Sequence, residues 1–460
     1  MMKYFFCGIG GSGMSALASA LRLQGFEVAG SDRSFDNKQN LELKQKLEKI
    51  GIIIKPQDGS GINNSFDALV ISSAVEPSIP DVKKALDIKL KIIKRAELLA
   101  DVFNKNAGIA IGGTSGKTTV TGICGHILQK TGLDPFVING GIINGSQEGI
   151  GNAVLGTGKM VIEADESDGS IALYNPQIAV ITNISLDHKS LDELNVLFAD
   201  FVKRASIGAV LNMDCEKTFA LKQYAKKFLS YSVKNPEADI LASNIILNSF
   251  GSSFEVFGEK VILNIPGIHN ISNTLAAIAA SILLGADAKQ AAKAASSFCG
   301  IKRRLEVIGK FKNITVIDDF AHNPDKINAS MAALKKMGTN VKIFFQMHGF
   351  APTKLFGRDI AKVFAKYFEE GDIIVVPEIY YAGGTVDKSI SSKLITDEIN
   401  RQGKEAYFFE SRLEAKNFII ETVVDGDVVV VMGARDNTLS DLAKEIFQAL
   451  TKRSDLCGKS

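Results

Sequence analysis

A short apolar run that enters a glycine-rich turn constrains the fold of this chain more than any other segment. The run Ile109–Ile111 leads into Gly112-Gly113-Thr114-Ser115-Gly116-Lys117-Thr118-Thr119, and apolar residues at helical spacing follow. A strand, a turn and a helix in this order surround a polyphosphate with backbone N–H groups at the N-terminus of the helix. The segment therefore predicts a nucleotide-driven enzyme of the α/β class.

This loop is shorter than a full Walker phosphate-binding motif, because Ile111 stands where that motif has its outer glycine. We expect Lys117 to neutralise charge on the β- and γ-phosphates of ATP and the Thr118 hydroxyl to reach Mg²⁺. A turn with a purely structural role is the alternative, but the Lys-Thr-Thr sequence stands where the ion chemistry needs it. The predicted ATP site comprises Gly113, Thr114, Ser115, Gly116, Lys117, Thr118 and Thr119.

Acidic and polar residues end two later apolar runs. Glu163 follows Met160–Ile162 and opens the sequence Glu-Ala-Asp-Glu-Ser-Asp, while His188 comes after Ile178–Ile181. Clustered carboxylates repel unless a cation or hydrogen bonds compensate them, and Mg²⁺ takes one or two carboxylates together with substrate phosphates. Because parallel strands end at one edge of a sheet, we expect Glu163 and His188 to converge on the phosphate loop. A solvated acidic loop and an ordinary loop histidine are the alternatives.

A second glycine-rich turn follows the first apolar run of the chain. Gly8, Gly10 and Gly13 form a GxGxxG pattern, and Asp32 has about the spacing of the acidic residue in dinucleotide sites. This pattern indicates a pyrophosphate at the N-terminus of a helix. An NAD site is one interpretation, and a UDP-sugar site is the other, since both ligands carry a pyrophosphate.

Two weaker candidates lie further along the chain. Asn270 and Asn273 share one face of an alanine-rich helix that we expect from about Asn270; a helix cap is the interpretation that the spacing favours, and contact with a base is the alternative. Asp319 follows an apolar run, where a carboxylate can meet a ribose hydroxyl, and Arg304 could contact a transferring phosphoryl group.

Length and periodicity predict several domains. A chain of 460 residues is too long for one ordinary core, and its first and last blocks alternate short apolar runs with helical patterns, which is typical of parallel sheets. We place the domains at 1–104, 105–300 and 301–460. The runs are Tyr4–Cys7, Phe26–Ala29, Ile52–Ile54, Ala68–Ile71 and Ile92–Ile93 in the first block, and Thr315–Ile317, Lys342–Gln346, Ile373–Val376, Tyr407–Phe409 and Val428–Met432 in the last.

Composition excludes several classes of protein. The net charge of +2 gives no nucleic-acid footprint, and no apolar run is long enough to span a bilayer. The five cysteines are scattered and odd in number, so a disulfide framework is not expected and a reducing cytoplasm fits best.

The order of these motifs resembles the Mur ligase family along the whole chain. The shared motifs are Gly8–Met14, Gly30-Ser31-Asp32, Ser72-Ser73-Ala74, Arg95-Ala96-Glu97, the phosphate loop, the acidic run, the His-Asn pair at 269–270, and the arginines, aspartates and histidine between 303 and 324. The resemblance implies three α/β domains: an N-terminal Rossmann-like domain that binds a UDP-sugar, a central P-loop ATPase-like domain, and a C-terminal Rossmann-like domain.

The resemblance also implies an ATP- and Mg²⁺-dependent ligase of peptidoglycan biosynthesis. Its expected substrates are UDP-N-acetylmuramate, whose lactyl carboxylate becomes an acyl phosphate, and an amine that then displaces phosphate. L-alanine is the amine expected first, and a tripeptide or another amine is the alternative. From other classes, an NAD-dependent oxidoreductase or an inactive nucleotide-binding module remains possible. We expect a monomer or a homodimer that binds no nucleic acid.

The resemblance also implies roles for individual residues. The implied magnesium ligands are Thr118, Glu163 and His188. The implied contacts with ATP are His269, Asn270 and Asn273 on the adenine side, Asp319 at the ribose and Arg304 near the phosphates. Lys117, His188 and Arg304 are the expected catalytic residues. The expected substrate-binding residues are Gly8, Gly10, Gly11, Gly13, Met14, Asp32, Ser72, Ser73, His322 and His348.

Departures from the family pattern fall near the expected amine. Members that add L-alanine usually carry Gln-Pro-His-Arg-Tyr-Thr-Arg where this chain has the sequence 346–352, so that Gly349 and Pro352 replace two arginines. They usually have two histidines where this chain has His322-Asn323, and the residues after His188 also differ. The sequence therefore leaves the identity of the amine open.

Overall fold

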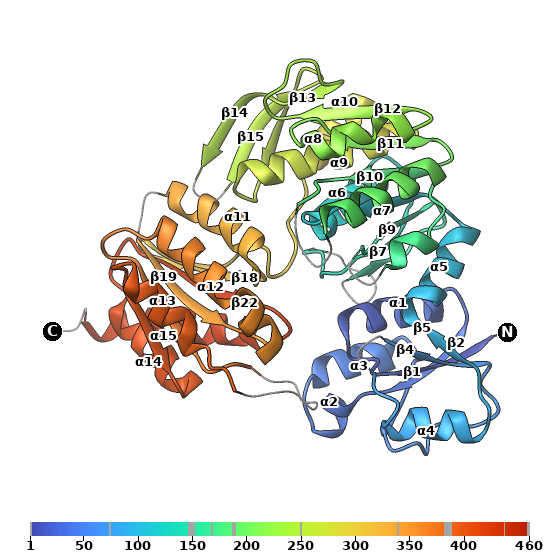
Figure 1. Ribbon diagram of the computed structural model, residues 1–460, viewed down its shortest axis with the longest axis horizontal. Coiled ribbons are helices and arrows are strands. Elements are labelled where there is room, and N and C mark those ends of the chain that lie inside the picture. Colours follow the sequence, from blue (N-terminus) through green and yellow to red (C-terminus); the bar gives the residue numbers. More distant parts are fainter. Residues whose placement is uncertain are drawn as a thin grey trace. The chain divides into compact units, whose positions relative to one another are not determined.

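The computed structural model describes residues 2–72, 75–145, 152–166, 169–185, 190–248, 251–337, 340–380, 389–436 and 438–457. The chain divides into two compact units (Figure 1). The first unit comprises Met1–Ile245, Ser253–Leu263 and Asn270–Ile301, and the second comprises Ile246–Ser252, Asn264–His269 and Lys302–Ser460. None of the helices described is both long and apolar enough to cross a membrane.

The first unit begins with a five-stranded parallel sheet in the order β3-β2-β1-β4-β5. Its strands are β1 (Lys3–Cys7), β2 (Glu27–Ser31), β3 (Ile53–Lys55), β4 (Ala68–Ile71) and β5 (Ile92–Lys94). The helices are α1 (Ser12–Leu23), α2 (Arg33–Asp36), α3 (Leu41–Lys49), α4 (Pro80–Asp87) and α5 (Arg95–Lys105). All five apolar runs predicted for this block are therefore strands, as expected for apolar segments that are covered by helices.

An eight-stranded sheet follows, in the order β13-β12-β11-β10-β6-β9-β7-β8. Its pairs are parallel except for β7 and β8. The strands are β6 (Ile109–Gly112), β7 (Phe136–Ile138), β8 (Ala153–Val154), β9 (Met160–Glu163), β10 (Ile178–Ile181), β11 (Gly208–Asn212), β12 (Phe228–Ser232) and β13 (Ile240–Leu241). The strand β6 that enters the phosphate loop is thus flanked by β10 and β9, whose ends carry the other predicted site residues.

Helices and a small sheet complete this region. The α-helices are α6 (Lys117–Lys130), α7 (Leu191–Arg204), α8 (Glu216–Phe219), α9 (Ile268–Leu283) and α10 (Ala288–Ala295), and the 3₁₀ helices are η1 (Ser170–Leu173) and η2 (Ala220–Tyr224). The small sheet consists of β14 (Ser243–Asn248), β15 (Gly251–Val256) and β16 (Glu259–Leu263). The cap predicted at Asn270 is wrong. Because Gly267 makes the turn that precedes α9, with φ of 98°, the helix begins at Ile268 and Asn270 lies in its first turn.

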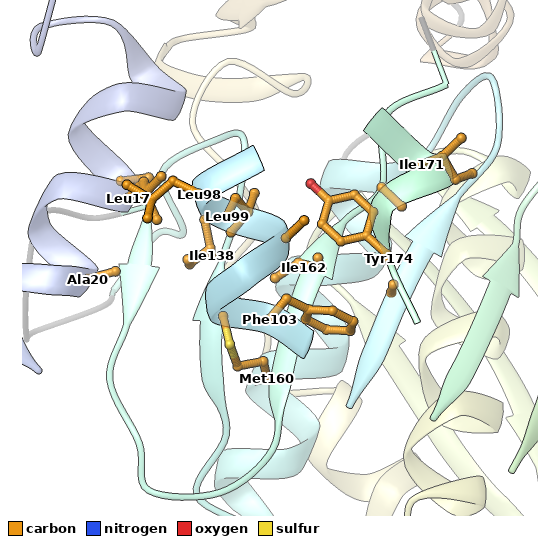
Figure 2. Packing of buried hydrophobic residues seen from close by; sticks show 14 of the residues in the cluster. Leu17, Ala20, Leu98, Leu99, Phe103, Ile138, Met160, Ile162, Ile171 and Tyr174 are labelled. Atoms are coloured by element: carbon orange, nitrogen blue, oxygen red, sulfur yellow. The ribbon is translucent and has the colours of Figure 1, made fainter. Parts of the chain in front are cut away.

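A shared core joins the two larger sheets of the first unit. Figure 2 shows α5 between α1 and the central sheet, with Leu98, Leu99 and Phe103 facing these neighbours. The rings of Phe103 and Tyr174 meet edge to face, with 5.6 Å between their centroids. The amide of Asn152 donates to the backbone oxygen of Ser12 at 2.7 Å, directly at the start of α1. This core and this hydrogen bond fix the N-terminal glycine-rich turn against the central sheet.

The second unit contains a six-stranded sheet in the order β17-β18-β22-β19-β20-β21. Its strands are β17 (Glu306–Phe311), β18 (Ile314–Asp319), β19 (Val341–Gln346), β20 (Ile373–Pro377), β21 (Ala406–Phe409) and β22 (Val428–Gly433). All are parallel to their neighbours except β17, which runs antiparallel to β18. The five runs predicted for this block are confirmed as strands. The edge strand β17 was missed, because its pattern is only half buried.

Helices cover both faces of this sheet. Alternate residues of its strands contribute to two separate clusters, one with α11 (Pro324–Leu334), α12 (Phe350–Tyr367) and α13 (Lys393–Arg401), the other with α14 (Arg412–Thr422) and α15 (Leu439–Cys457). A 3₁₀ helix, η3 (Lys335–Met337), follows α11. The arrangement is that of an open, doubly wound sheet, in which ligands bind beyond the carboxyl ends of the strands.

Candidate active site

The phosphate loop connects the buried strand β6 to α6 and is shaped by two glycines. Gly113 and Gly116 have φ of 125° and 89°, values that favour glycine. A Cβ atom at Gly113 would overlap the Thr182 hydroxyl, and one at Gly116 would lie 2.5 Å from Oδ1 of Asn273. The strand–turn–helix prediction is confirmed, and Asn273 of α9 lies directly at the loop.

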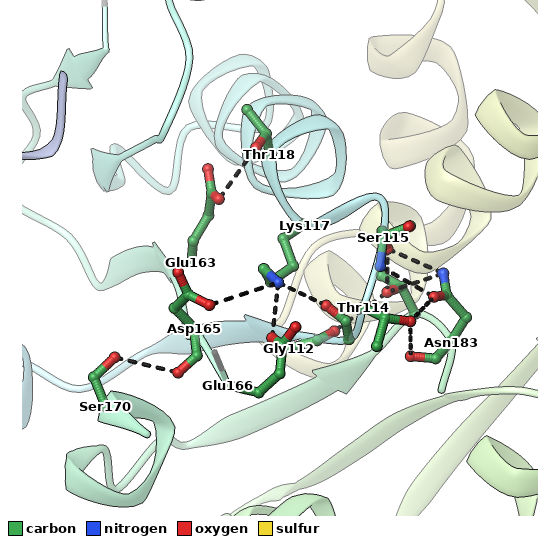
Figure 3. A network of polar contacts seen from close by, with 12 residues as sticks. Gly112, Thr114, Ser115, Lys117, Thr118, Glu163, Asp165, Glu166, Ser170 and Asn183 are labelled. Atoms are coloured by element: carbon green, nitrogen blue, oxygen red, sulfur yellow. Dashed lines mark hydrogen bonds and ion pairs between the residues drawn. The ribbon is translucent and has the colours of Figure 1, made fainter. Parts of the chain in front are cut away.

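Lys117 is held at the loop by carboxylates from the acidic run (Figure 3). Its Nζ donates to the backbone oxygen of Gly113 at 2.8 Å and to Oε2 of Glu166 at 2.7 Å, and it lies 4.0 Å from Oδ1 of Asp165. Burial by itself lowers the pKa of Lys117, but the carboxylates, Glu166 first, raise it by more. Lys117 is therefore a cation, and for the buried Glu166 the alternative of a solvated loop is wrong.

Glu163 and Thr118 meet beside this lysine. The Thr118 hydroxyl donates to Oε2 of Glu163 at 3.1 Å, and the backbone N–H of Gly140 donates to Oε1 at 2.5 Å. A hydroxyl and a carboxylate next to each other at a phosphate loop form the kind of oxygen donor set that Mg²⁺ takes. These two residues therefore fit the predicted metal. The third predicted ligand, His188, lies outside the described residues.

Thr182 and Asn183, which directly follow β10, hold the loop and had no predicted role. Oδ1 of Asn183 accepts hydrogen bonds from the Thr114 hydroxyl at 2.6 Å and from the Ser115 N–H at 3.0 Å. Its Nδ2 donates to the backbone oxygen of Ser115 at 3.0 Å, as does the Thr182 hydroxyl at 2.6 Å. The signal in the sequence was their place after the run Ile178–Ile181, because β10 pairs directly with β6.

The N-terminal glycine-rich turn is built mainly from backbone hydrogen bonds. The N–H groups of Gly8 and Ile9 donate to the backbone oxygen of Ser31 at 2.8 and 2.9 Å. Asp32 accepts from the Gly10 N–H at 2.7 Å and from the Ser34 N–H at 2.9 Å, which also caps α2. Asp32 thus already holds the turn together, and its contact with a ligand stays a prediction.

The remaining residues predicted for the UDP-sugar site differ in their surroundings. A Cβ at Gly13 would lie 3.3 Å from Nη1 of Arg95, so the start of α1 faces a guanidinium. Met14 is buried in the shared core of the first unit. Gly11 precedes α1 as its N-cap and Ser72 follows β4, whereas Ser73 lies outside the described residues.

The predicted contacts with adenine fall on the start of α9. Asn270 and Asn273 are both buried, and Nδ2 of Asn273 lies 3.4 Å from Oδ1 of Asn270, so the two amides share a face as expected. His269 belongs to the second unit, where burial lowers its pKa to about 4.

Thr119, the last residue predicted for the phosphate loop, follows Thr118 in the first turn of α6.

In the second unit the predicted residues gather around Phe320. The guanidinium carbon of Arg304 lies 5.0 Å from the centre of the Phe320 ring, and Nδ1 of His322 is 2.8 Å from the Phe320 backbone oxygen. Asp319 is buried and accepts from the Ser330 hydroxyl, and burial raises its pKa. The rings of His322 and His348 are 5.3 Å apart. The predicted ribose contact of Asp319 and phosphate contact of Arg304 stay predictions.

Three family models match successive parts of the chain. They are described as the Mur ligase family catalytic domain over residues 3–106, the Mur ligase middle domain over residues 111–281, and the Mur ligase glutamate ligase domain over residues 303–435.

Curated relatives and solved structures match nearly the full length. The UDP-N-acetylmuramate–L-alanine ligase of Dictyoglomus turgidum is 37% identical over 449 residues, covering 94% of both chains. That of a Sulfurihydrogenibium species is 35% identical and covers 97% of this chain and 98% of the relative. The crystal structure of UDP-N-acetylmuramate-alanine ligase from Thermotoga maritima has a TM-score of 0.81 at 27% identity, covering 98% of this chain and all of that chain.

Proposed function

The chain belongs to the Mur ligase family, and we propose on that basis that it joins L-alanine to UDP-N-acetylmuramate at the expense of ATP. Two observations together carry this function. Near full-length curated relatives are named for this reaction, and the phosphate loop has a lysine, a threonine and a nearby glutamate that suit phosphoryl transfer. NAD-dependent oxidation would not require this cationic loop.

The reaction proceeds in two displacements. An oxygen of the lactyl carboxylate attacks the γ-phosphorus of ATP. The bond between that phosphorus and the oxygen that bridges it to the β-phosphate breaks, so that ADP departs and an acyl phosphate forms. The nitrogen of L-alanine then attacks the acyl carbon, the bond to the phosphate oxygen breaks, and the amine gives up a proton. The products are the amide, ADP and phosphate.

The residues of the phosphate loop lower the electrostatic cost of the first displacement. In the structure Lys117 is paired with Glu166, and we propose that it exchanges part of this contact for the β- and γ-phosphates when ATP binds. The N–H groups at the start of α6 point the positive end of the helix dipole at the same phosphates. Asn183 and Thr182 keep the loop in one conformation and so avoid reorganisation during the reaction.

Thr118 and Glu163 are the described residues that would hold Mg²⁺. Bound Mg²⁺ offsets the negative charge of the two reacting anions. Gly140 would keep Glu163 oriented through its N–H donor. His188 as a further ligand, the domain boundaries at 104 and 300, a cytoplasmic location and a monomeric or dimeric state belong to the same proposal.

A panel of amines tests this function. Phosphate release is measured with ATP, Mg²⁺ and UDP-N-acetylmuramate in the presence of L-alanine, glycine, L-serine or the tripeptide, with reactions that lack either the UDP-sugar or the amine as controls. We expect release that requires both substrates and is fastest with L-alanine.

Other outcomes would replace the proposal with a specific alternative. Fastest release with the tripeptide would make the chain a tripeptide ligase. Binding of NADH without release for any amine would support the oxidoreductase. Binding of ATP without any turnover would indicate an inactive nucleotide-binding module.

A further inference from the structure

Three neighbouring strands of the second unit end at one place in the sheet. The strand β22 lies between β18 and β19, with Met432 opposite Asp319 and Gly433 opposite Gln346. A Cβ at Gly433 would lie 2.6 Å from the backbone oxygen of Gln346, so the ends of β22 and β19 are in direct contact. The residues that follow these strands therefore gather at one edge, and they include His322, His348 and Arg435.

The two histidines at this edge are neutral, and one of them has an unused ring nitrogen. The residue His348 is 7% exposed, and among the described residues its Nδ1 is buried without a hydrogen-bond partner. Burial, together with the charges of Arg435 and Lys326, lowers the pKa of His348 to about 4. A buried nitrogen without a partner is costly, and a bound ligand that donates a hydrogen bond would remove this cost.

Arg435 stands on a braced, strained turn directly after β22. Its φ of 60° is unfavourable for a residue with a side chain, and such strain persists where the surroundings enforce it. Arg303 supplies this support by donating to the backbone oxygens of Gly433 at 2.8 Å and Asp436 at 3.0 Å. Arg412 adds an ion pair with Asp436 at 2.7 Å.

Arg435 differs from the two arginines that hold the turn in what its side chain contacts. The guanidinium groups of Arg303 and Arg412 are used in holding the turn, whereas the side chain of Arg435 is exposed and, within the described residues, makes no hydrogen bond or ion pair. The turn thus fixes the backbone from which the Arg435 side chain extends, and the charge of this side chain acts on His348, whose pKa it helps to lower.

This arrangement suits a small amino acid. A guanidinium binds a carboxylate through two parallel hydrogen bonds, and a neutral imidazole nitrogen accepts a hydrogen bond from an amine. We propose that Arg435 binds the carboxylate of the incoming amino acid, beside His348; this proposal rests on the ligase function proposed above. Gly349 and Pro352 at the start of α12 offer no cation, so Arg435 supplies the charge from the neighbouring strand.

The test removes the side chain without adding strain. Glycine tolerates the left-handed backbone at position 435, so Arg435→Gly should fold at least as well as the wild type. We expect Arg435→Gly to raise KM for L-alanine by about tenfold or more, which corresponds to a lost hydrogen bond to a charged group. The values of kcat and of KM for ATP and UDP-N-acetylmuramate should change less than about twofold.

Two further measurements identify the carboxylate as the group recognised. L-alaninamide has no carboxylate, so the wild type should prefer L-alanine to it, and Arg435→Gly should lose that preference. Arg435→Lys should restore part of it, because lysine keeps the charge but not the paired donors. Arg401→Ala is the matched control, since Arg401 is an exposed arginine on α13 whose partner is Glu398.

The outcomes separate this inference from the function on which it rests. The comparison uses whichever amine of the panel the wild type accepts, so failure of L-alanine alone refutes the proposed acceptor and not the role of Arg435. An unchanged KM for the accepted amine in Arg435→Gly overturns the inference. A loss of the preference in Lys326→Ala, with none in Arg435→Gly, would assign the carboxylate to Lys326 and also overturn it.

Discussion

The two glycine-rich turns of the first unit have the same architecture and different electrostatics. Each follows a buried parallel strand, β1 or β6, and opens a helix. The turn at 8–14 has no cation in its own sequence, although the guanidinium of Arg95 lies beside Gly13, and its acidic partner Asp32 is occupied by protein N–H donors. The turn at 113–117 ends in Lys117, which is surrounded by carboxylates, with Thr118 and Glu163 beside it.

This difference in charge suits the first turn to binding a substrate and the second to transferring a phosphoryl group. Backbone N–H groups and a helix dipole are enough to hold a pyrophosphate that stays intact. A phosphoryl group that is transferred changes its charge distribution, and cations that are already in position stabilise that change. We therefore expect substitutions in the first turn to alter substrate affinity, and substitutions in the second to alter turnover.

Lys117→Ala gives the largest expected effect. Among the described residues, Lys117 is the cation that contacts the backbone oxygen of Gly113 in the loop. Without it the charge of the transferred phosphoryl group is not offset, so kcat for phosphate release should fall by about a thousandfold or more. Binding of UDP-N-acetylmuramate, measured by calorimetry without ATP, should stay within about twofold of the wild type. Retained turnover together with lost binding of the UDP-sugar would reverse the assignment of the two turns.

Glu163→Gln should have the second-largest effect, a weaker affinity for Mg²⁺. The substitution keeps the shape of the side chain but removes the charge that pairs with a divalent cation, so the Mg²⁺ concentration for half-maximal activity should rise at least about tenfold. Glu48→Gln, an exposed glutamate on α3, is the control and should leave the titration unchanged. An unaltered Mg²⁺ titration in Glu163→Gln would remove Glu163 from the metal site.

Gly10→Ala probes the first turn by itself. The added methyl group would lie 2.8 Å from Oδ2 of Asp32 and so displace the carboxylate that holds the turn. We expect KM for UDP-N-acetylmuramate to rise about fivefold, with kcat nearly unchanged. Gly11→Ala should have a smaller effect, because its methyl group would meet the Gly8 oxygen at an ordinary 3.5 Å. A fall in kcat with constant KM would contradict the assignment of this turn to binding.

Glu166→Gln has the smallest expected effect and concerns stability. Lys117 would exchange a charged acceptor for a neutral one, so the free energy of unfolding in urea should fall by about 1 kcal/mol. Asp165→Asn should cost less, because its carboxylate is half exposed and 4.0 Å from the lysine. Equal losses in the two variants would show that the distance to Lys117 does not decide the strength of the pairing.

Local sequence patterns predicted the buried strands well, but they missed an edge strand and misplaced the start of one helix. Apolar runs such as Ala68–Ile71 and Ile178–Ile181 became strands with the same bounds, because buried parallel strands need continuous apolar segments. The edge strand β17 was not predicted, since a half-buried strand has no continuous apolar run. The helix α9 begins two residues before its predicted start, because Gly267 makes the turn that precedes it, although asparagine is favoured at caps.

The sequence by itself determined the strand–loop–helix units and the cation of the phosphate loop, because each depends on residues close together in the sequence. It also indicated the family, because the order of motifs along the chain can be read without knowing their contacts. Only the tertiary structure decided which carboxylate pairs with Lys117, that Asn183 holds the loop, and that Arg435 comes to lie near His348. These contacts depend on the order and register of strands that are distant in the sequence. Periodicity predicts that such strands exist, but it does not say which of them become neighbours.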